Sequence, residues 1–337
     1  MPEESFRIVV VDEANAHHVG NVFRSVYGED FPVKYVYQPE VLWREIGAGR
    51  LAAALAFAQG GRAVGYLSSF KSTPNFRLWE AGNLVVDPEF AKTDVASQLT
   101  KYYFSPYMRS MTDSDGLFSE AVCCHYFTQV SAIKAGMFDC ALEFDQLSGE
   151  SFKDGKSNRA ELARVSCLLN FREFTNPVER QYLPVRYEKM LRGLAAPLRP
   201  RTFVAAGTSL PTEGMTVRED NYFEFAQTWK IAVRKIGADW AAVIDEILAE
   251  ALRRRVISLQ ITLNTACPHI DAATGVLQGR GFFFGGLMPR WFGTDGMLMQ
   301  KLFGDEPEFE KIKLYTPTAR NLLDFIRADR QAVNSSG

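Results

Sequence analysis

Apolar and polar residues recur along this chain with two different periods, and together these predict a mixed α/β fold. Short apolar runs predict strands, whereas apolar residues that recur every three or four positions predict helices. In the first half the pattern predicts strands at residues 6–11, 51–59, 62–70, 78–86, 116–124, 138–144 and 164–171. It predicts helices there at residues 14–28, 39–49, 95–111 and 128–136.

The second half repeats much of this order. Strands are predicted at residues 202–206, 215–219, 223–233, 256–263, 282–289 and 296–303, and helices at residues 240–255, 270–280 and 319–333. Each half ends in a helix, a glycine and an aromatic strand, which indicates an internal repeat whose second copy lacks the two opening helices. We therefore predict two domains, at residues 1–175 and 201–337, joined by a helical connector over residues 176–200.

Single residues mark several of the predicted boundaries. Gly60 and Gly61 predict a tight hairpin between two strands. Pro106 is expected to kink the helix at 95–111, and Asp239 is a suitable N-cap for the helix that follows it. The polar segment at 148–161 is rich in Gly, Ser and Lys, which predicts a mobile loop.

Composition narrows the functional classes. Of the 337 residues 47% are hydrophobic and 23% are charged, which is typical of a globular protein with a sizeable core. A net charge of −2 gives no field that would attract nucleic acid or an anionic membrane, so we expect neither as a partner. The sequence shows no signal peptide and no long apolar run, and its five cysteines lack metal-ligand spacing. We expect a cytoplasmic protein without a bound metal; a homodimer is one open alternative.

Several stretches together resemble the GNAT acetyltransferase superfamily in a tandem form. They are FRIVVVDEANAHHVGNVF at the start, GRAVGYLSSF from Gly61, NLVVDPEF from Asn83, and the helix–glycine–aromatic ends at Gly136 and Gly281. The resemblance implies an α/β fold with two GNAT-like domains in tandem, each a mixed, mostly antiparallel sheet flanked by helices. It also implies that a sheet opens between its fourth and fifth strands, where the pantetheine arm of acetyl-CoA or another acyl-CoA enters.

The family's pyrophosphate loop is altered in this chain. A helix N-terminus holds phosphate through unpaired N–H groups, and glycines let the backbone approach closely. Here the expected first glycine falls on Lys92 or Asp94, and only Ala96 fits a small-residue position. A carboxylate at ~4–6 Å from the pyrophosphate would cost about 1–4 kcal/mol. Asp94 or Thr93 as a helix N-cap is the alternative interpretation. The residues that the resemblance assigns to the cofactor are Val85, Val86, Lys92, Thr93, Asp94, Val95 and Ala96.

Candidate catalytic residues lie on the fourth and fifth predicted strands. Glu80 interrupts an apolar strand near the expected opening, where burial would raise its pKa and suit it as a base; an exposed glutamate, or one paired with Arg77, is equally open. His125 and Tyr126 end the fifth strand and are candidates for a base and for the acid that protonates the thiolate, although His125 also has a structural interpretation. The tyrosine that family members often use as the acid is replaced by Ala132 and Leu277 in the two copies.

The resemblance places the acceptor against the loop between the first two helices. Candidate substrate-binding residues are Glu29, Asp30, Phe31 and Glu120, a set that suits a small, partly apolar amine. The leading hypothesis is thus transfer of an acyl group, such as acetyl, from acyl-CoA to the amine of a small molecule. A GNAT-like binding or regulatory protein without activity, and an acyltransferase with a donor other than CoA, are the alternatives.

Overall fold

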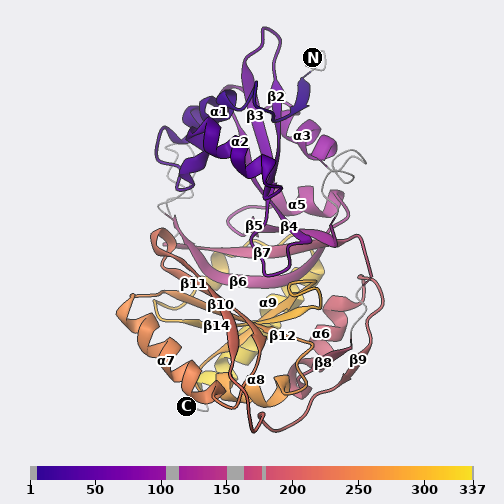
Figure 1. The fold of residues 1–337 in the computed structure, drawn as a ribbon, viewed down its shortest axis with the longest axis vertical. Coiled ribbons are helices and arrows are strands. Elements are labelled where there is room, and N and C mark those ends of the chain that lie inside the picture. Colours follow the sequence, from indigo (N-terminus) through magenta and orange to yellow (C-terminus); the bar gives the residue numbers. More distant parts are fainter. Residues whose placement is uncertain (1–5, 104–113, 150–162, 177–179, 336–337) are drawn as a thin grey trace.

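The computed structural model describes residues 6–103, 114–149, 163–176 and 180–335, and one large sheet runs through both halves of the chain (Figure 1). The strands of the first half are β1 (Arg7–Val10), β2 (Leu51–Phe57), β3 (Ala63–Phe70), β4 (Leu78–Val86), β5 (Gly116–Val122), β6 (Phe138–Ser148) and β7 (Arg164–Glu173). Its helices are α1 (His17–Tyr27), η1 (Lys34–Tyr37), α2 (Pro39–Gly47), η2 (Pro88–Phe90), α3 (Val95–Tyr103) and α5 (Phe127–Lys134).

The second half begins with a short two-stranded sheet and a connector helix. These are β8 (Gln181–Leu183), η5 (Val185–Tyr187), α6 (Glu188–Ala195) and β9 (Phe203–Ala205). The remaining strands are β10 (Val217–Phe223), β11 (Thr228–Lys235), β12 (Ser258–Asn264), β13 (Phe283–Met288) and β14 (Gly296–Leu302). The remaining helices are η6 (Glu224–Ala226), α7 (Trp240–Arg253), α8 (Ile270–Gln278), η7 (Phe309–Lys311) and α9 (Pro317–Asn334).

The main sheet has twelve strands in the order β1-β2-β3-β4-β5-β7-β6-β13-β14-β12-β11-β10. Its pairs are antiparallel except β4–β5 and β11–β12, which are parallel. The two halves join edge to edge at β6 and β13, where Gly286 lies opposite Ala141. The predicted α/β class with mixed, mostly antiparallel sheets is therefore confirmed, and the two sheets are continuous.

Successive side chains of a strand point to opposite faces of the sheet, and each face packs against a different helix. On β2, Leu55 packs in one cluster with Val19 and Phe23 of α1, whereas its neighbour Ala54 packs in another cluster with Leu99 of α3. Helices α1 and α3 therefore cover opposite faces of the first sheet, as expected from the two-residue period of a strand (Figure 1). The largest cluster contains residues of both halves, from Leu78 to Ile326. The predicted domain boundary at 176–200 stays a prediction.

Several predicted elements need correction in the second half. The predicted strand at 223–233 is broken by η6 and by Gln227, whose φ of 50° is left-handed, so β10 ends before it and β11 begins after it. Asp239 occupies the N-cap position of α7, but its carboxylate accepts hydrogen bonds from the N–H and hydroxyl of Thr216, both at 2.8 Å, instead of capping the helix. The β8 strand was not predicted. Pro106 and residues 150–161 of the predicted loop lie outside the described residues.

Candidate active site

The parallel strands β4 and β5 separate after three residue pairs. Leu78, Trp79 and Glu80 face Gly116, Leu117 and Phe118, and the strands then diverge although both continue. The equivalent pair in the second half, β11 and β12, stays paired over six residues from Thr228 to Val233. The opening that the resemblance implies is therefore present between β4 and β5, and its counterpart between β11 and β12 is closed.

A bulge in β4 lies along this opening. The register with β3 shifts between Tyr66 opposite Val85 and Ser68 opposite Gly82, and Asn83 within the shift has a φ of 55°. A bulge leaves the extra residue outside the regular ladder of hydrogen bonds. Asn83 and Leu84 therefore lie outside the regular register of β3 and β4, beside the opening.

A cleft of about 630 Å³ lies between the two halves, next to the point where β4 and β5 separate. The first half lines it with the β3–β4 loop and with residues of β4, β5 and β6, and the second half with residues of β10, β11 and β12. Its charged lining residues include Glu80, Glu120, Glu143 and Lys230, together with Lys71, Glu219 and Asp220.

Lys230 on β11 forms ion pairs with two of these carboxylates. Its Nζ lies 2.7 Å from Oε1 of Glu120 and 2.9 Å from Oε1 of Glu143. Burial disfavours the ammonium, but the two carboxylates outweigh it, so the pKa of Lys230 is raised. The Gln146 amide donates to the second oxygen of Glu120. The ion-pair cluster thus connects β5 and β6 of the first half with β11 of the second.

Glu80 is a suitable base by position and by pKa. Burial, and then the Glu120 carboxylate, raise its pKa to about 8, whereas a hydrogen bond with Ser72 and the charge of Lys230 oppose the rise. Burial and Glu120 similarly raise the pKa of Glu143 to about 8. Three carboxylates around one ammonium would carry two excess negative charges, so the cluster retains a proton near neutral pH. Arg77 does not neutralise Glu80, because its guanidinium lies 3.1 Å from Asp115.

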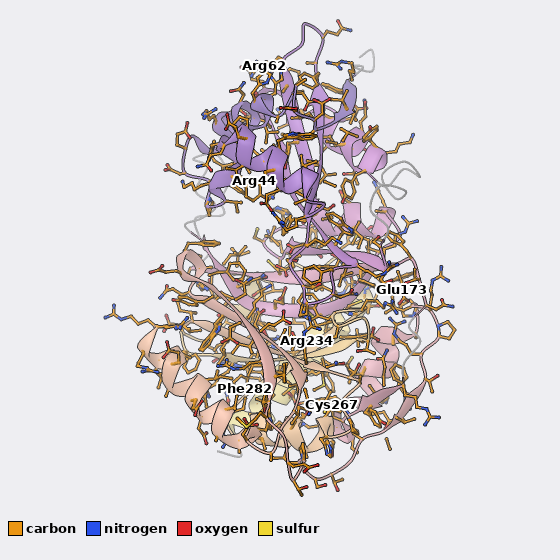
Figure 2. All side chains as sticks on the ribbon, in the orientation of Figure 1. Arg44, Arg62, Glu173, Arg234, Cys267 and Phe282 are labelled. Carbon is orange, nitrogen blue, oxygen red and sulfur yellow. The ribbon has the colours of Figure 1, made fainter. Side chains whose placement is uncertain are left out.

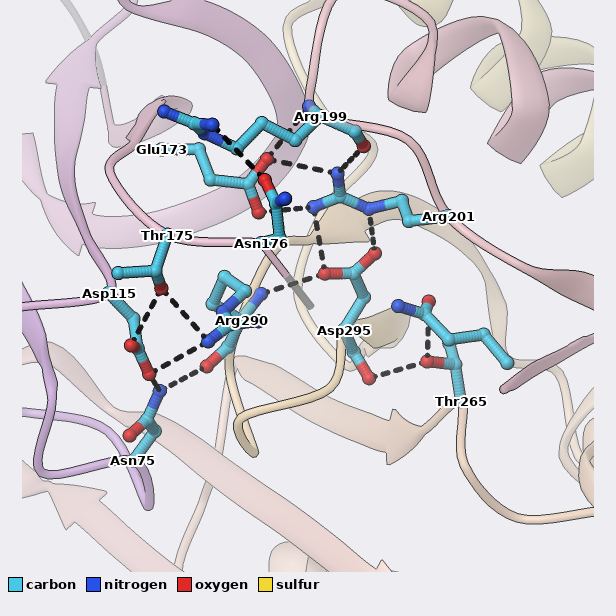
Figure 3. Close-up of polar contacts among 11 residues, drawn as sticks. Asn75, Asp115, Glu173, Thr175, Asn176, Arg199, Arg201, Thr265, Arg290 and Asp295 are labelled. Atoms are coloured by element: carbon cyan, nitrogen blue, oxygen red, sulfur yellow. Dashed lines mark hydrogen bonds and ion pairs between the residues drawn. The ribbon is translucent and has the colours of Figure 1, made fainter. Parts of the chain in front are cut away.

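Buried ion pairs between the halves hold the walls of the cleft (Figure 3). Arg201 is almost fully buried and lies 3.0 Å from Glu173 and 2.5 Å from Asp295. Arg290 lies 3.0 Å from Asp115, and the backbone oxygen of Arg290 accepts a hydrogen bond of 2.8 Å from Asn75 in the β3–β4 loop. These contacts tie the loop that lines the cleft to the second half.

Arg234 of β11 secures the same loop from the other side. It lies near the centre of the molecule in Figure 2, and its guanidinium donates a hydrogen bond of 2.8 Å to the backbone oxygen of Pro74. The β3–β4 loop is therefore held by two arginines of the second half, Arg234 and Arg290, which fixes the position of Glu80 at the start of β4.

The acidic residues in and beside the predicted cofactor loop contact other side chains of the first half. Arg62, at the far end of the first half in Figure 2, lies 2.5 Å from Asp87 and 2.6 Å from Glu89. The Asp94 carboxylate accepts a hydrogen bond of 2.8 Å from the Gln98 side chain, and its backbone oxygen accepts from the Gln98 N–H. Asp94 is thus the N-cap of α3 through its backbone.

The other predicted cofactor residues differ in how far their side chains are exposed to solvent. The Thr93 hydroxyl lies 3.5 Å from the Val95 N–H. Lys92 is exposed, Val86 and Ala96 are half-buried, and the side chains of Val85 and Val95 are in the core. Val85 and Val95 can therefore reach a ligand only through their backbone groups.

The remaining candidate residues lie outside the cleft. His125 and Tyr126 follow the diverging end of β5, and the Tyr126 ring is 6.4 Å from that of Tyr315. Glu29 is exposed and lies 2.6 Å from Arg24, and Asp30 is exposed. Phe31 packs on Phe23, with ring centroids 4.7 Å apart. Of the predicted site residues the structure therefore brings only Glu80 and Glu120 together in the cleft.

Sequence reasoning missed Glu143 and Lys230. Each is a charged residue within an apolar strand, in FDCALEF and TWKIAV, which is the same signal that identified Glu80. Among the described residues no group of three or more His, Cys, Asp and Glu side chains is placed to hold a metal ion. The described helices include none with the length and apolar character needed to cross a membrane.

Comparisons with known proteins find similarity to solved structures. No protein-family model and no curated protein matches the chain. Similar structures include a GNAT-family acetyltransferase from Bacillus cereus, with 12% identity, 51% of this chain and 99% of that chain covered, and a TM-score of 0.35. The ribosomal-protein-S5-alanine acetyltransferase from Vibrio fischeri has 11% identity, with 51% and 95% covered and a TM-score of 0.40. An aminoglycoside 6'-N-acetyltransferase complexed with coenzyme A has 14% identity, with 51% and 99% covered and a TM-score of 0.35.

These similarities are too remote to assign an activity, and each spans about half of the chain. The fold itself follows from the strand order of this structure. The diverging parallel pair β4–β5 and its closed counterpart β11–β12 occupy equivalent places in two successive α/β units. By this arrangement each α/β unit has one parallel strand pair within a mostly antiparallel sheet, the mixed type of sheet that the sequence predicts.

Proposed function

We propose that this chain is an acyltransferase that moves an acyl group, such as acetyl, from acyl-CoA to the amine of a small molecule bound in the cleft. The observation that carries the proposal is the position of Glu80. It is the last residue of β4 that pairs with β5, so it lies where the opening begins, and its side chain lines the cleft. Donor and acceptor would therefore meet at one carboxylate.

The raised pKa gives Glu80 the chemistry of a general base. An ammonium must lose a proton before its nitrogen can attack, and a base works best when its pKa is near the working pH. In the proposal Glu80 accepts that proton, and backbone N–H groups of the bulge at Asn83 donate to the carbonyl oxygen as negative charge develops on it. The acyl-CoA supplies the activated carbonyl. The nitrogen–carbon bond forms as the carbon–sulfur bond breaks. The nitrogen then loses its second proton, which replaces the proton that Tyr126 or water gives to the thiolate.

The residues around the opening partly fit acyl-CoA. Leu84 and Val86 lie half-exposed or exposed along the diverging part of β4, which leaves apolar surface for a pantetheine arm. The start of α3 offers the backbone N–H group of Ala96, with that of Val95 at the Thr93 hydroxyl and the exposed Lys92 nearby. The negative charge of Asp94 would repel a pyrophosphate, although one of its carboxylate oxygens accepts a hydrogen bond from the Gln98 side chain.

The test is calorimetric titration with acetyl-CoA, followed by an assay of thiol release with a panel of amines. We expect binding in the micromolar range that weakens in Lys92→Ala, and amine-dependent thiol release that is lost in Glu80→Gln. Glu188→Gln is the matched control, because Glu188 is an exposed residue of α6 paired with Arg192. Thiol release that persists in Glu80→Gln would exclude Glu80 as the base.

The altered loop also supports a second candidate, a GNAT-like binding protein without transferase activity. The glycines are absent from 90–96, and Asp94 and Glu89 add negative charge there. Absence of acetyl-CoA binding up to millimolar concentration would favour this candidate, or a donor other than CoA. The cytoplasmic location, the lack of nucleic-acid, membrane and metal partners, and a homodimer stay predictions.

A further inference from the structure

The cleft between the halves has opposite chemistry at its deep and exposed ends. Glu143, Gln146 and Gln260 are buried residues that line it, with Glu143 fully inaccessible at 0% exposure. Phe76 and Phe225 also line it, and they are 74% and 52% exposed. We call the first set the polar floor and the second set the aromatic mouth.

The polar floor contains hydrogen-bond acceptors that the protein does not satisfy. Oε2 of Glu143 and Oε1 of Gln146 accept no hydrogen bond from any residue that the structure describes. The orientation of the Gln146 amide follows from its contact with Glu120, because only its nitrogen can donate to that carboxylate. Leaving buried acceptors without donors is costly, so these two oxygens indicate a ligand group that donates hydrogen bonds.

A cation fits this floor better than a neutral donor. An ammonium carries three donors, and the carboxylates of Glu80, Glu120 and Glu143 exceed the single charge of Lys230. Gln260 of β12 adds an amide with an unpartnered Nε2 among the described residues. Since an amide can present either end, Gln260 can also turn its oxygen towards an ammonium.

The aromatic mouth offers an apolar surface from both halves. Phe76 comes from the β3–β4 loop of the first half, and Phe225 comes from η6 of the second. Phe223 supports Phe225, with ring centroids 6.2 Å apart in an edge-to-face arrangement. Large exposed aromatic side chains at the mouth of a cleft gain free energy when an apolar or aromatic ligand covers them.

Negative charge dominates the cleft. Its lining carries the carboxylates of Glu80, Glu120, Glu143, Glu219 and Asp220 against two lysines: Lys230, which is paired with Glu120 and Glu143, and Lys71, which donates to the backbone oxygen of Phe76. A carboxylate on the ligand would meet this excess of negative charge. Amino acids are therefore poor ligands for this cleft, whereas the corresponding amines without the carboxylate are suitable.

We propose that the acceptor is a primary amine with an aromatic body and no carboxylate. Its ammonium binds the floor at Glu143 and Gln146, within the carboxylate cluster that includes Glu80, and its ring lies against Phe76 and Phe225. The identification as an acyl acceptor rests on the proposed function, but the binding does not. The second half is thus part of the acceptor site, through Phe225, Lys230 and Gln260.

The test is calorimetric titration of the full chain with 2-phenylethylamine, L-phenylalanine and ethylamine. We expect 2-phenylethylamine to bind about tenfold or more tightly than either of the others, because one lacks the ring and the other adds a repelled carboxylate. Truncating both rings, in Phe76→Ala/Phe225→Ala, should reduce the preference over ethylamine severalfold. Phe127→Ala is the matched control, because Phe127 is an exposed phenylalanine of α5 outside the cleft.

The outcomes separate this inference from the proposed function. Equal affinity for 2-phenylethylamine and L-phenylalanine, or an unchanged preference in the double variant, would overturn the inference even if acetyl-CoA binds and is turned over with another amine. Selective binding of 2-phenylethylamine without acetyl-CoA binding would support the inference and overturn the proposed donor. Circular dichroism and thermal unfolding would verify that each variant is folded; Phe76 and Phe225 are exposed, so their truncation should leave the core intact.

Discussion

The ammonium of Lys230 lies 2.9 Å from the carboxylate of Glu143, although the two residues are 87 positions apart and belong to different halves of the chain. Glu143 is on β6 and Lys230 is on β11. The same ammonium contacts Glu120 on β5 at 2.7 Å. One side chain of the second half therefore supplies the positive charge in a carboxylate cluster whose candidate base, Glu80, belongs to the first.

Replacement of Lys230 by Met should strongly destabilise the protein. Removing one partner of a buried ion pair leaves uncompensated charge, which costs about 3–5 kcal/mol in the free energy of unfolding. The measurement is urea denaturation at pH 7. The double variant Lys230→Met/Glu143→Gln should recover part of the loss, because it removes one of the unpaired carboxylates. If Lys230→Met were as stable as the wild type, the ion pair would contribute nothing.

The free energy of unfolding should fall as the pH rises from acid to mildly alkaline values, because Glu80 and Glu143 lose their protons over this range. Burial and Glu120 raise the pKa of each to about 8, above the ordinary value of 4.5. Between pH 4.5 and about 8 the folded state therefore binds more protons than the unfolded state. This contribution is fully present below pH 4.5 and is lost as the pH rises through about 8.

The measurement for this pH dependence is the free energy of unfolding from pH 5 to 9 in the wild type and in Glu80→Gln. The variant cannot ionise at that position, so its stability should decrease less across the range. An equal slope in the two proteins would show that Glu80 titrates near its ordinary pKa.

Arg201 should be a main determinant of how firmly the two halves are joined. It is buried between Glu173 and Asp295 (Figure 3), so Arg201→Met should lower the free energy of unfolding by about 3–5 kcal/mol. Arg201→Lys should cost less, because it keeps the charge but cannot bind two carboxylates through a planar fork. Arg199→Met is the control, since Arg199 is exposed and should change stability by about 0.5 kcal/mol or less.

Gly286 allows β13 to approach β6, so its replacement by Ala should weaken the joint between the halves. A Cβ there would lie 2.4 Å from the Cα of Ala141 and 2.5 Å from the backbone oxygen of Cys140, and Gly286 has a φ of 138°. We expect a loss of about 1–3 kcal/mol in thermal or urea unfolding. Gly275→Ala is the control: a Cβ at this exposed position of α8 meets no described atom within 4 Å, and alanine should stabilise the helix by about 0.5–1 kcal/mol.

The first half could be predicted well because its signals are local. The strand at 78–86 was predicted at its observed bounds, since an apolar run ends there at Asp87 and Pro88. The hairpin at Gly60 and Gly61 is confirmed, with φ of 90° and 84°. Glu80 was identified because a carboxylate in an apolar strand is exceptional whatever its neighbours are.

The second half was predicted less well because tertiary contacts override local pattern there. The pattern around 223–227 is apolar enough for a strand, yet Gln227 turns the chain, and the Gln227 backbone oxygen accepts a hydrogen bond of 2.8 Å from the Ile257 N–H. The β8 strand has three residues and exists by pairing with β9, so no periodicity could reveal it.

Periodicity in the sequence by itself determined most strands and helices of the first half, the α/β class and Glu80, because these depend on which residues along one segment are apolar. Tertiary structure alone decided that β6 and β13 join the two sheets, that β11 and β12 stay paired, and that Lys230 meets Glu143. Such pairings depend on packing between segments far apart in the chain, and a strand's own pattern states which face is buried but not which strand lies beside it.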